Sequence, residues 1–283
     1  MPLNRRGRMM GLYGDTDTGK TTQLGQYMKW LYMTTGQRSR FNFIDKGSFA
    51  SIEALVEVGI IEVNIYDPAT DPWIWIDDAV NGVGLADDIG FVGIDGASGC
   101  CEELMNWITH DPRQFGQQKT QRFTVASGAR TLTVGANNEA HYGLVQNFMR
   151  DKLFKSAQLL AKGRDVGWTF GLWRGEGQDG SARLGPLLAG KALTPVIPKW
   201  FTYFFPLVTV PTVAGEAPRH LLYTAEQPEF GGTGMCFANA RYPLEASTPL
   251  PAIIEPASLV RAVELIEQGR AEALEVVKGE VGR

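Results

Sequence analysis

The stretch Gly14-Asp15-Thr16-Asp17-Thr18-Gly19-Lys20-Thr21 decides the fold of this chain. It matches the pattern GxxxxGK[ST], in which glycines let the backbone turn so that its N–H groups converge on phosphate oxygens. A short apolar run at residues 9–13 precedes the loop, and apolar residues at helical spacing follow it over residues 21–35. The following helix adds the positive end of its dipole to the loop. The sequence therefore predicts a phosphate-binding loop between a strand and a helix.

Each residue type in this loop has an expected role. Lys20 is expected to reach the β- and γ-phosphate oxygens, and the Thr21 hydroxyl is expected to ligate Mg²⁺. Asp15 and Asp17 are unusual there, because a carboxylate about 4 Å from a phosphate costs on the order of 4 kcal/mol at an effective dielectric of 20. We expect both to point away or to face a cation. The predicted binding residues are Gly14, Asp15, Thr16, Asp17, Thr18, Gly19, Lys20, Thr21 and Thr22.

A second acidic residue is needed to hold Mg²⁺ beside such a loop, at the end of a neighbouring strand. The run Ile89-Gly90-Phe91-Val92-Gly93-Ile94-Asp95 is a hydrophobic strand that ends in an aspartate. Asp95 is therefore the predicted metal partner of Thr21, and a strand-end turn aspartate is the alternative interpretation.

Short apolar runs alternate with helical patterns along the chain, which is typical of an α/β domain with a mostly parallel sheet flanked by helices. Residues 111–138 break this alternation, and we interpret them as a long loop or an inserted hairpin with strands at 123–125 and 131–134. A terminal amphipathic helix is expected at 257–268. We predict one domain over residues 1–283, with a core at about 8–227 and a C-terminal extension at about 228–283.

Composition excludes several classes of protein. Apolar residues make up 44% of the 283 residues and charged residues 20%, which fits a folded globular chain and excludes a disordered one. Cys100, Cys101 and Cys236 have neither a disulfide framework nor zinc-type spacing, which favours a reducing compartment. The longest apolar run, at 200–210, is too short to span a membrane. We therefore expect a cytoplasmic protein without a membrane partner.

Charge is divided unevenly along the chain. Residues 45–103 contain 13 acidic residues and one basic residue, whereas residues 104–174 contain ten basic and four acidic residues. Such asymmetry between neighbouring segments can mark a nucleic-acid face, and solvated surface charge is the alternative.

The phosphate loop, FNFID ending at Asp45 and FVGID ending at Asp95 together resemble the RecA-like ATPases. GPLLAGKAL at residues 185–193 extends the resemblance to a phage-encoded branch, some of whose members act as single-strand annealing recombinases. The resemblance implies a RecA-like core that uses ATP and Mg²⁺. It also implies a cytoplasmic location in a bacterial host cell.

Only some of the family's catalytic residues have clear counterparts in this chain. RecA-like enzymes use a glutamate shortly after the second strand to orient the attacking water, and Asp45 is the best substitute here. The family also places a polar sensor at the end of the strand before its DNA loop, where this chain has Leu172 and Trp173; Arg174 is the candidate replacement. In filaments of this family a neighbour's cation completes the ATP site, and Lys191 is the candidate for that role.

The resemblance also predicts DNA contact through the segments at about 96–138 and 175–185. Four cations interspersed with Phe115 and Phe123 suit a sequence-tolerant single-strand binder, and a solvated polar loop is the alternative. The candidate DNA-binding residues are Arg113, Lys119, Arg122 and Arg130.

The resemblance predicts an ATPase with slow, DNA-stimulated hydrolysis that self-assembles as a filament or ring on single-stranded DNA and promotes phage annealing or recombination. A single-strand DNA-binding protein is a further candidate partner. Two alternatives stay open, a helicase or packaging-type motor and a nucleotide-dependent DNA-binding scaffold with little hydrolysis.

Overall fold

The computed structural model describes residues 7–44, 46–110, 121–127, 130–136, 139–176, 180–189, 194–210, 216–229 and 234–281. The elements of the first half are β1 (Met9–Tyr13), α1 (Lys20–Thr35), β2 (Arg38–Phe43), η1 (Lys46–Ile52), α2 (Glu53–Glu57), β3 (Ile61–Ile65), α3 (Pro72–Asn81), β4 (Ile89–Asp95) and α4 (Ala97–His110). Those of the second half are β5 (Gln121–Ser127), β6 (Arg130–Ala136), α5 (Glu139–Ala161), β7 (Asp165–Glu176), β8 (Ala182–Leu187), η3 (Ile197–Trp200), β9 (Tyr203–Val210), β10 (Arg219–Tyr223), β11 (Gln227–Pro228), β12 (Met235–Cys236), β13 (Ile253–Ile254) and α6 (Leu259–Val281).

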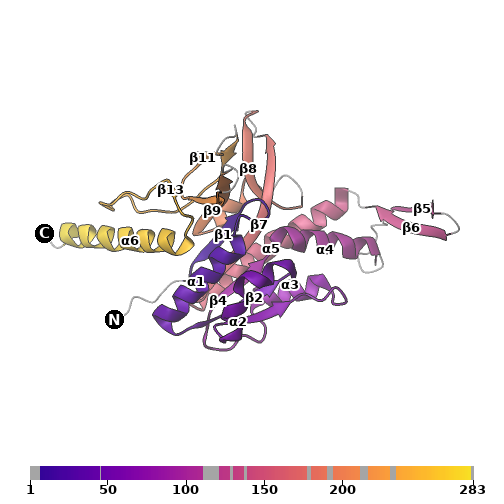
Figure 1. The fold of residues 1–283 in the computed structure, drawn as a ribbon, viewed down its shortest axis with the longest axis horizontal. Helices are drawn as coiled ribbons and strands as arrows, with labels where there is room; N and C mark the ends of the chain where they lie inside the picture. The colour runs from indigo at the N-terminus through magenta and orange to yellow at the C-terminus, as the bar shows by residue number, and fades with distance from the viewer. Residues whose placement is uncertain are drawn as a thin grey trace.

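The centre of the main sheet is parallel and has the strand order β3-β2-β4-β7-β1-β9. β10 and β13 continue the sheet beyond β9 in antiparallel pairing. The second half of β7 pairs antiparallel with β8. β12 then pairs with β8, and β11 pairs with β12. Because β1, β4 and β7 are parallel, the loops that follow β1 and β4 meet at one edge of the sheet (Figure 1).

Helices cover both faces of this sheet, and the alternation of side chains in β1 explains why. Met10 and Leu12 point to the face on which α1 and α6 pack. Met9 and Tyr13 point to the opposite face, on which α3, α4 and α5 pack. All five residues of β1 are buried, as expected for a central parallel strand covered on both sides. The predicted α/β class, with a mostly parallel sheet flanked by helices, an inserted hairpin and a C-terminal helix, agrees with this architecture.

The structure corrects the sequence interpretation at three places. Residues 97–110, placed within a DNA loop, form α4, because its apolar side chains recur at helical spacing and pack against the core. Residues 175–185, predicted as a second DNA-contacting loop, belong in part to β7 and β8, which pair from Gly171 with Leu187 to Glu176 with Ala182. The terminal helix α6 continues to Val281, well beyond residue 268. The inserted hairpin is present as β5 and β6, which project away from the main sheet (Figure 1).

The C-terminal helix α6 packs against α1. Leu259, Val263 and Ile266 share a hydrophobic core with residues of α1. Gln23 of α1 fixes the start of α6, since its side-chain amide donates to the carbonyl of Ala257 at 2.9 Å and accepts from the N–H of Leu259 at 2.8 Å. The first part of α6 therefore packs on the helix that follows the phosphate loop. None of the helices in the described ranges is long and apolar enough to cross a membrane.

Candidate functional site

The phosphate loop joins the end of β1 to the start of α1, as the sequence predicts. Gly19 directly precedes α1 with a φ of 86°, and Asp17 has a φ of 61°, so the loop makes two left-handed turns. A Cβ atom on Gly14 would lie 2.5 Å from the carbonyl oxygen of Leu207 in β9. Glycine is therefore required at residue 14 by close packing and favoured at residue 19 by backbone conformation.

Lys20 folds back over the loop. Its Nζ donates to the carbonyl oxygens of Gly14 at 3.1 Å and Asp15 at 2.6 Å. Burial lowers the pKa of Lys20 from its usual value, and the nearby carboxylates of Asp95, Asp15 and Asp17 oppose that shift. The ammonium group thus stands over the backbone that would surround a phosphate.

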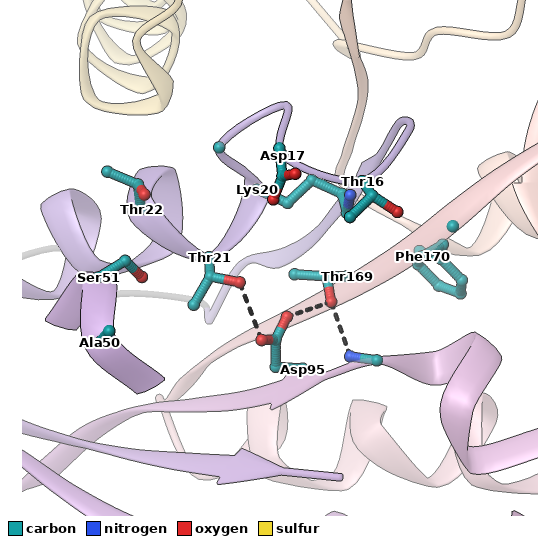
Figure 2. Close-up of a pocket in the computed structure, with 13 residues that line it drawn as sticks. Thr16, Asp17, Lys20, Thr21, Thr22, Ala50, Ser51, Asp95, Thr169 and Phe170 are labelled. Carbon is teal, nitrogen blue, oxygen red and sulfur yellow. Dashed lines mark hydrogen bonds between the residues drawn. The ribbon is translucent and has the colours of Figure 1, made fainter. Parts of the chain in front are cut away.

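Asp95 lies at the carboxyl end of β4 and is 4% exposed. The Thr21 hydroxyl donates to Asp95 Oδ2 at 2.8 Å, and the Thr169 hydroxyl donates to Asp95 Oδ1. Thr169 Oγ1 in turn accepts from the backbone N–H of Gly96 at 2.8 Å. Figure 2 shows this chain of contacts from the start of α1 to β4 and β7. The structure therefore brings together the two residues that the sequence predicts as metal ligands.

Thr169 was missed by the sequence interpretation, which looked for a polar sensor at Leu172 and Trp173. The pairing of β4 with β7 places Ile94 opposite Trp168, so Thr169 lies beside Asp95. Leu172 and Trp173 lie further along β7, where the strand pairs with β8. The structure thus places a hydroxyl of β7 against Asp95, three residues before Leu172. Its signal in the sequence is a lone threonine within the otherwise apolar stretch at residues 166–173.

A cavity of about 580 Å³ opens above these residues (Figure 2). It is lined by Thr16, Asp17, Gly19, Lys20, Thr21, Thr22, Ala50, Ser51, Asp95, Gly96, Thr169, Phe170 and Gly171. Thr21 and Asp95 offer one hydroxyl and one carboxylate, a donor set that fits Mg²⁺, which keeps several waters and takes few protein ligands. Among the described residues there is no cluster of three or more His, Cys, Asp or Glu side chains that could bind a metal more fully.

A second cavity of about 450 Å³ lies on the other side of the loop and shares Thr16 and Asp17 with the first. Its walls come from the loop, from β9 and from the start of β10, and Arg174 lines it. Arg174, the predicted phosphate sensor, lines this second cavity and is not among the residues that line the first. Its guanidinium contacts Asp15 and Glu229. Hydrogen bonding to Asp15 raises the pKa of Arg174 above its usual value.

Several predicted site residues fall outside the described residues, namely Asp45, Arg113, Lys119 and Lys191. Arg122 lies near the open end of the β5–β6 hairpin, opposite Gly135. Arg130 begins β6 and pairs with Ser127 at the turn. The two arginines thus occupy opposite ends of the hairpin.

Comparisons with known proteins do not assign this chain to a family. No family model and no curated protein matches this chain. Among solved structures, the flagellar accessory protein FlaH from Methanocaldococcus jannaschii is similar over 77% of this chain and 78% of its own, with 11% identity and a TM-score of 0.41. A likeness this distant says nothing about function, which we infer from the geometry of the site.

Proposed function

We propose that this chain binds ATP with Mg²⁺ at the phosphate loop and hydrolyses it slowly. One observation carries the proposal. The hydroxyl of Thr21, directly after Lys20, lies 2.8 Å from the buried carboxylate of Asp95 beside a cavity large enough for a triphosphate. A hydroxyl, a carboxylate and an ammonium group arranged around one loop are the groups that bind a metal–triphosphate complex.

The same residues suggest how binding proceeds. Lys20 would exchange its two carbonyl partners for phosphate oxygens, which releases the loop carbonyls. Thr21 would give up its hydrogen bond to Asp95 so that its oxygen and the carboxylate face a cation. Mg²⁺, when bound, would neutralise charge on the phosphates. Thr169 would hold Asp95 in place during this exchange, because it contacts the other carboxylate oxygen.

The inferred rate is slow because the cavity holds few acidic groups. The carboxylates that line it belong to Asp17 and Asp95, and Asp95 is assigned to the metal. A water-orienting carboxylate must then come from outside this lining, and Asp45 is our candidate. The same observation favours the second candidate function, a nucleotide-dependent DNA-binding scaffold that turns over little ATP.

Binding is tested by calorimetry with ATPγS and Mg²⁺. We expect Lys20→Ala to weaken binding at least a hundredfold and Asp95→Asn to remove the dependence on Mg²⁺. Lys29→Ala is the matched control, because Lys29 is an exposed lysine of the same helix that does not line the cavity. Equal affinity of the Lys20→Ala and Lys29→Ala proteins would contradict the proposal.

We further propose that the protein self-assembles on single-stranded DNA through the basic segment that contains the β5–β6 hairpin. An isolated two-stranded hairpin is marginally stable in water, so a projecting one is suited to ordering against a partner. Four phosphate contacts predict a log–log salt slope of about −3 on single strands. The residues to replace together are Arg113, Lys119, Arg122 and Arg130.

Turnover and annealing distinguish the candidate functions. DNA-stimulated hydrolysis with strand annealing and no unwinding supports a recombinase of the phage annealing type, unwinding supports a motor, and nucleotide binding without turnover supports the scaffold. Mixing Lys191→Ala with Lys20→Ala protein tests a shared site between subunits, since restored hydrolysis requires that Lys191 act on a neighbour's ATP. DNA binding that ignores salt and survives the four replacements would remove the DNA assignment.

A further inference from the structure

Arg174 is held between two carboxylates at the edge of the phosphate loop. Its two terminal nitrogens donate to the two carboxylate oxygens of Asp15 at 3.2 and 3.0 Å, and one of them also donates to Glu229 at 2.8 Å. This paired geometry fixes Asp15 more strictly than a single contact would. Arg174 comes from β7, the strand that carries Thr169, so the loop and the metal site share one support.

Asp15 poses an electrostatic problem for this loop. It is the second residue of the motif, and its own carbonyl accepts from Lys20, so its carboxylate lies next to backbone that must receive a polyanion. Like charges placed this close to each other repel. The Asp15 side chain is 58% exposed, so water screens part of that repulsion. A fixed positive charge nearby is needed to offset the repulsion that remains.

We propose that Arg174 is a positioning residue that neutralises Asp15 and turns its carboxylate away from the ligand, which lets an acidic phosphate loop bind a polyphosphate. The inference rests on the proposed nucleotide binding and goes beyond it, because it assigns Arg174 to the loop itself and not to the γ-phosphate. The geometry favours this role, since both terminal nitrogens are already engaged by Asp15.

Glu229 supplies the second anchor for Arg174. Its backbone N–H donates to the carbonyl of Gly234 at 2.7 Å, which holds it beside the short strands β11 and β12. Its side chain is 21% exposed, whereas that of Arg174 is 53% exposed. Glu229 therefore restrains a half-exposed cation from the better-packed side, and it also competes with Asp15 for the positive charge of Arg174. Removing the charge of Glu229 would remove this competition, so that the charge of Arg174 acts more fully on Asp15.

The test is a double-mutant cycle on ATPγS–Mg²⁺ affinity, read by calorimetry at low salt. We expect Arg174→Ala to weaken binding about tenfold, and the double variant Arg174→Ala/Asp15→Asn to return to within about threefold of the parent. The Arg174→Lys variant keeps the charge and loses the two-pronged guanidinium contact, and its affinity is expected to lie between those of the parent and of Arg174→Ala. Glu229→Gln is expected to bind at least as tightly as the parent. The Arg174→Ala defect is expected to shrink at 0.5 M salt.

Arg219→Ala is the matched control. Arg219 makes a similar two-pronged contact with Glu255, is 55% exposed and lies outside both cavities. Its replacement is expected to leave affinity unchanged. Urea midpoints of all variants close to the parent's would exclude a folding defect.

Three outcomes overturn the inference. Unchanged affinity in Arg174→Ala would remove any role for this side chain. An Arg174→Ala defect that Asp15→Asn does not repair would assign Arg174 to direct contact with the ligand. A defect equal at low and high salt would argue against neutralisation. Failure of the proposed function is separate, because the parent protein would then bind no ATPγS, or Lys20→Ala would bind as well as the parent.

Discussion

The Thr169 hydroxyl offers the sharpest test of how the site is built. It donates to Asp95 and accepts from the N–H of Gly96 at 2.8 Å, and Thr169 is 1% exposed. Thr169→Val keeps the shape and removes the hydroxyl. A hydrogen bond to a charged group is worth about 1.5–3 kcal/mol, and an N–H left without its partner costs about 1 kcal/mol or more. We therefore expect the free energy of unfolding to fall by about 3 kcal/mol.

Thr169→Ser is the control, because it keeps both hydrogen bonds and loses one methyl group, at a cost of about 1 kcal/mol. Urea unfolding followed by tryptophan fluorescence measures both variants. For a chain of 283 residues the valine variant is expected to lower Tm by about 5 °C. We also expect weaker Mg²⁺-dependent binding of ATPγS in the valine variant, since Asp95 loses the contact that orients it. A valine variant as stable as the serine variant would refute the reasoning.

Three further predictions concern packing and ionisation. Gly14→Ala is expected to cost about 2 kcal/mol and to weaken nucleotide binding, because the new Cβ would lie 2.5 Å from the carbonyl oxygen of Leu207; urea titration and calorimetry check it. Arg8→Met is expected to cost about 3–5 kcal/mol, since it removes the Arg8 guanidinium from the buried carboxylate of Asp165, and Arg8→Met/Asp165→Leu is expected to recover much of that loss in the same titration. Burial raises the pKa of the Cys101 thiol from 9.0 to about 12, so this thiol is expected to resist a thiol reagent at pH 8 while the protein is folded. The stability that the protonated Cys101 thiol contributes is complete below pH 9 and is lost as the pH rises towards 12. We therefore expect the parent protein to lose more stability than the Cys101→Ala variant between pH 8 and pH 10, as urea midpoints would measure.

The phosphate loop and Asp95 could be predicted because their signals are local. The loop is eight consecutive residues whose spacing follows from how a backbone surrounds a phosphate. Asp95 ends a run of apolar residues, and the end of a buried parallel strand is where a metal-binding carboxylate belongs. The alternation of apolar runs with helical periods likewise predicted the parallel centre of the sheet. The break in that alternation at residues 111–138 predicted a long loop or an inserted hairpin, and the structure contains the hairpin.

The tertiary structure alone decided which distant side chains meet that loop. Thr169 contacts Asp95 across 74 residues of sequence, and Arg174 contacts Asp15 across 159. Both contacts depend on the register of β7 beside β4 and β1, and a shift of one residue would turn each side chain to the other face of the sheet. Because register is set by packing on both faces of the sheet, the short spacing of a motif carries no information about it. The sequence thus determined the chemistry of the phosphate loop, and strand register determined which hydroxyl and which cation lie beside it.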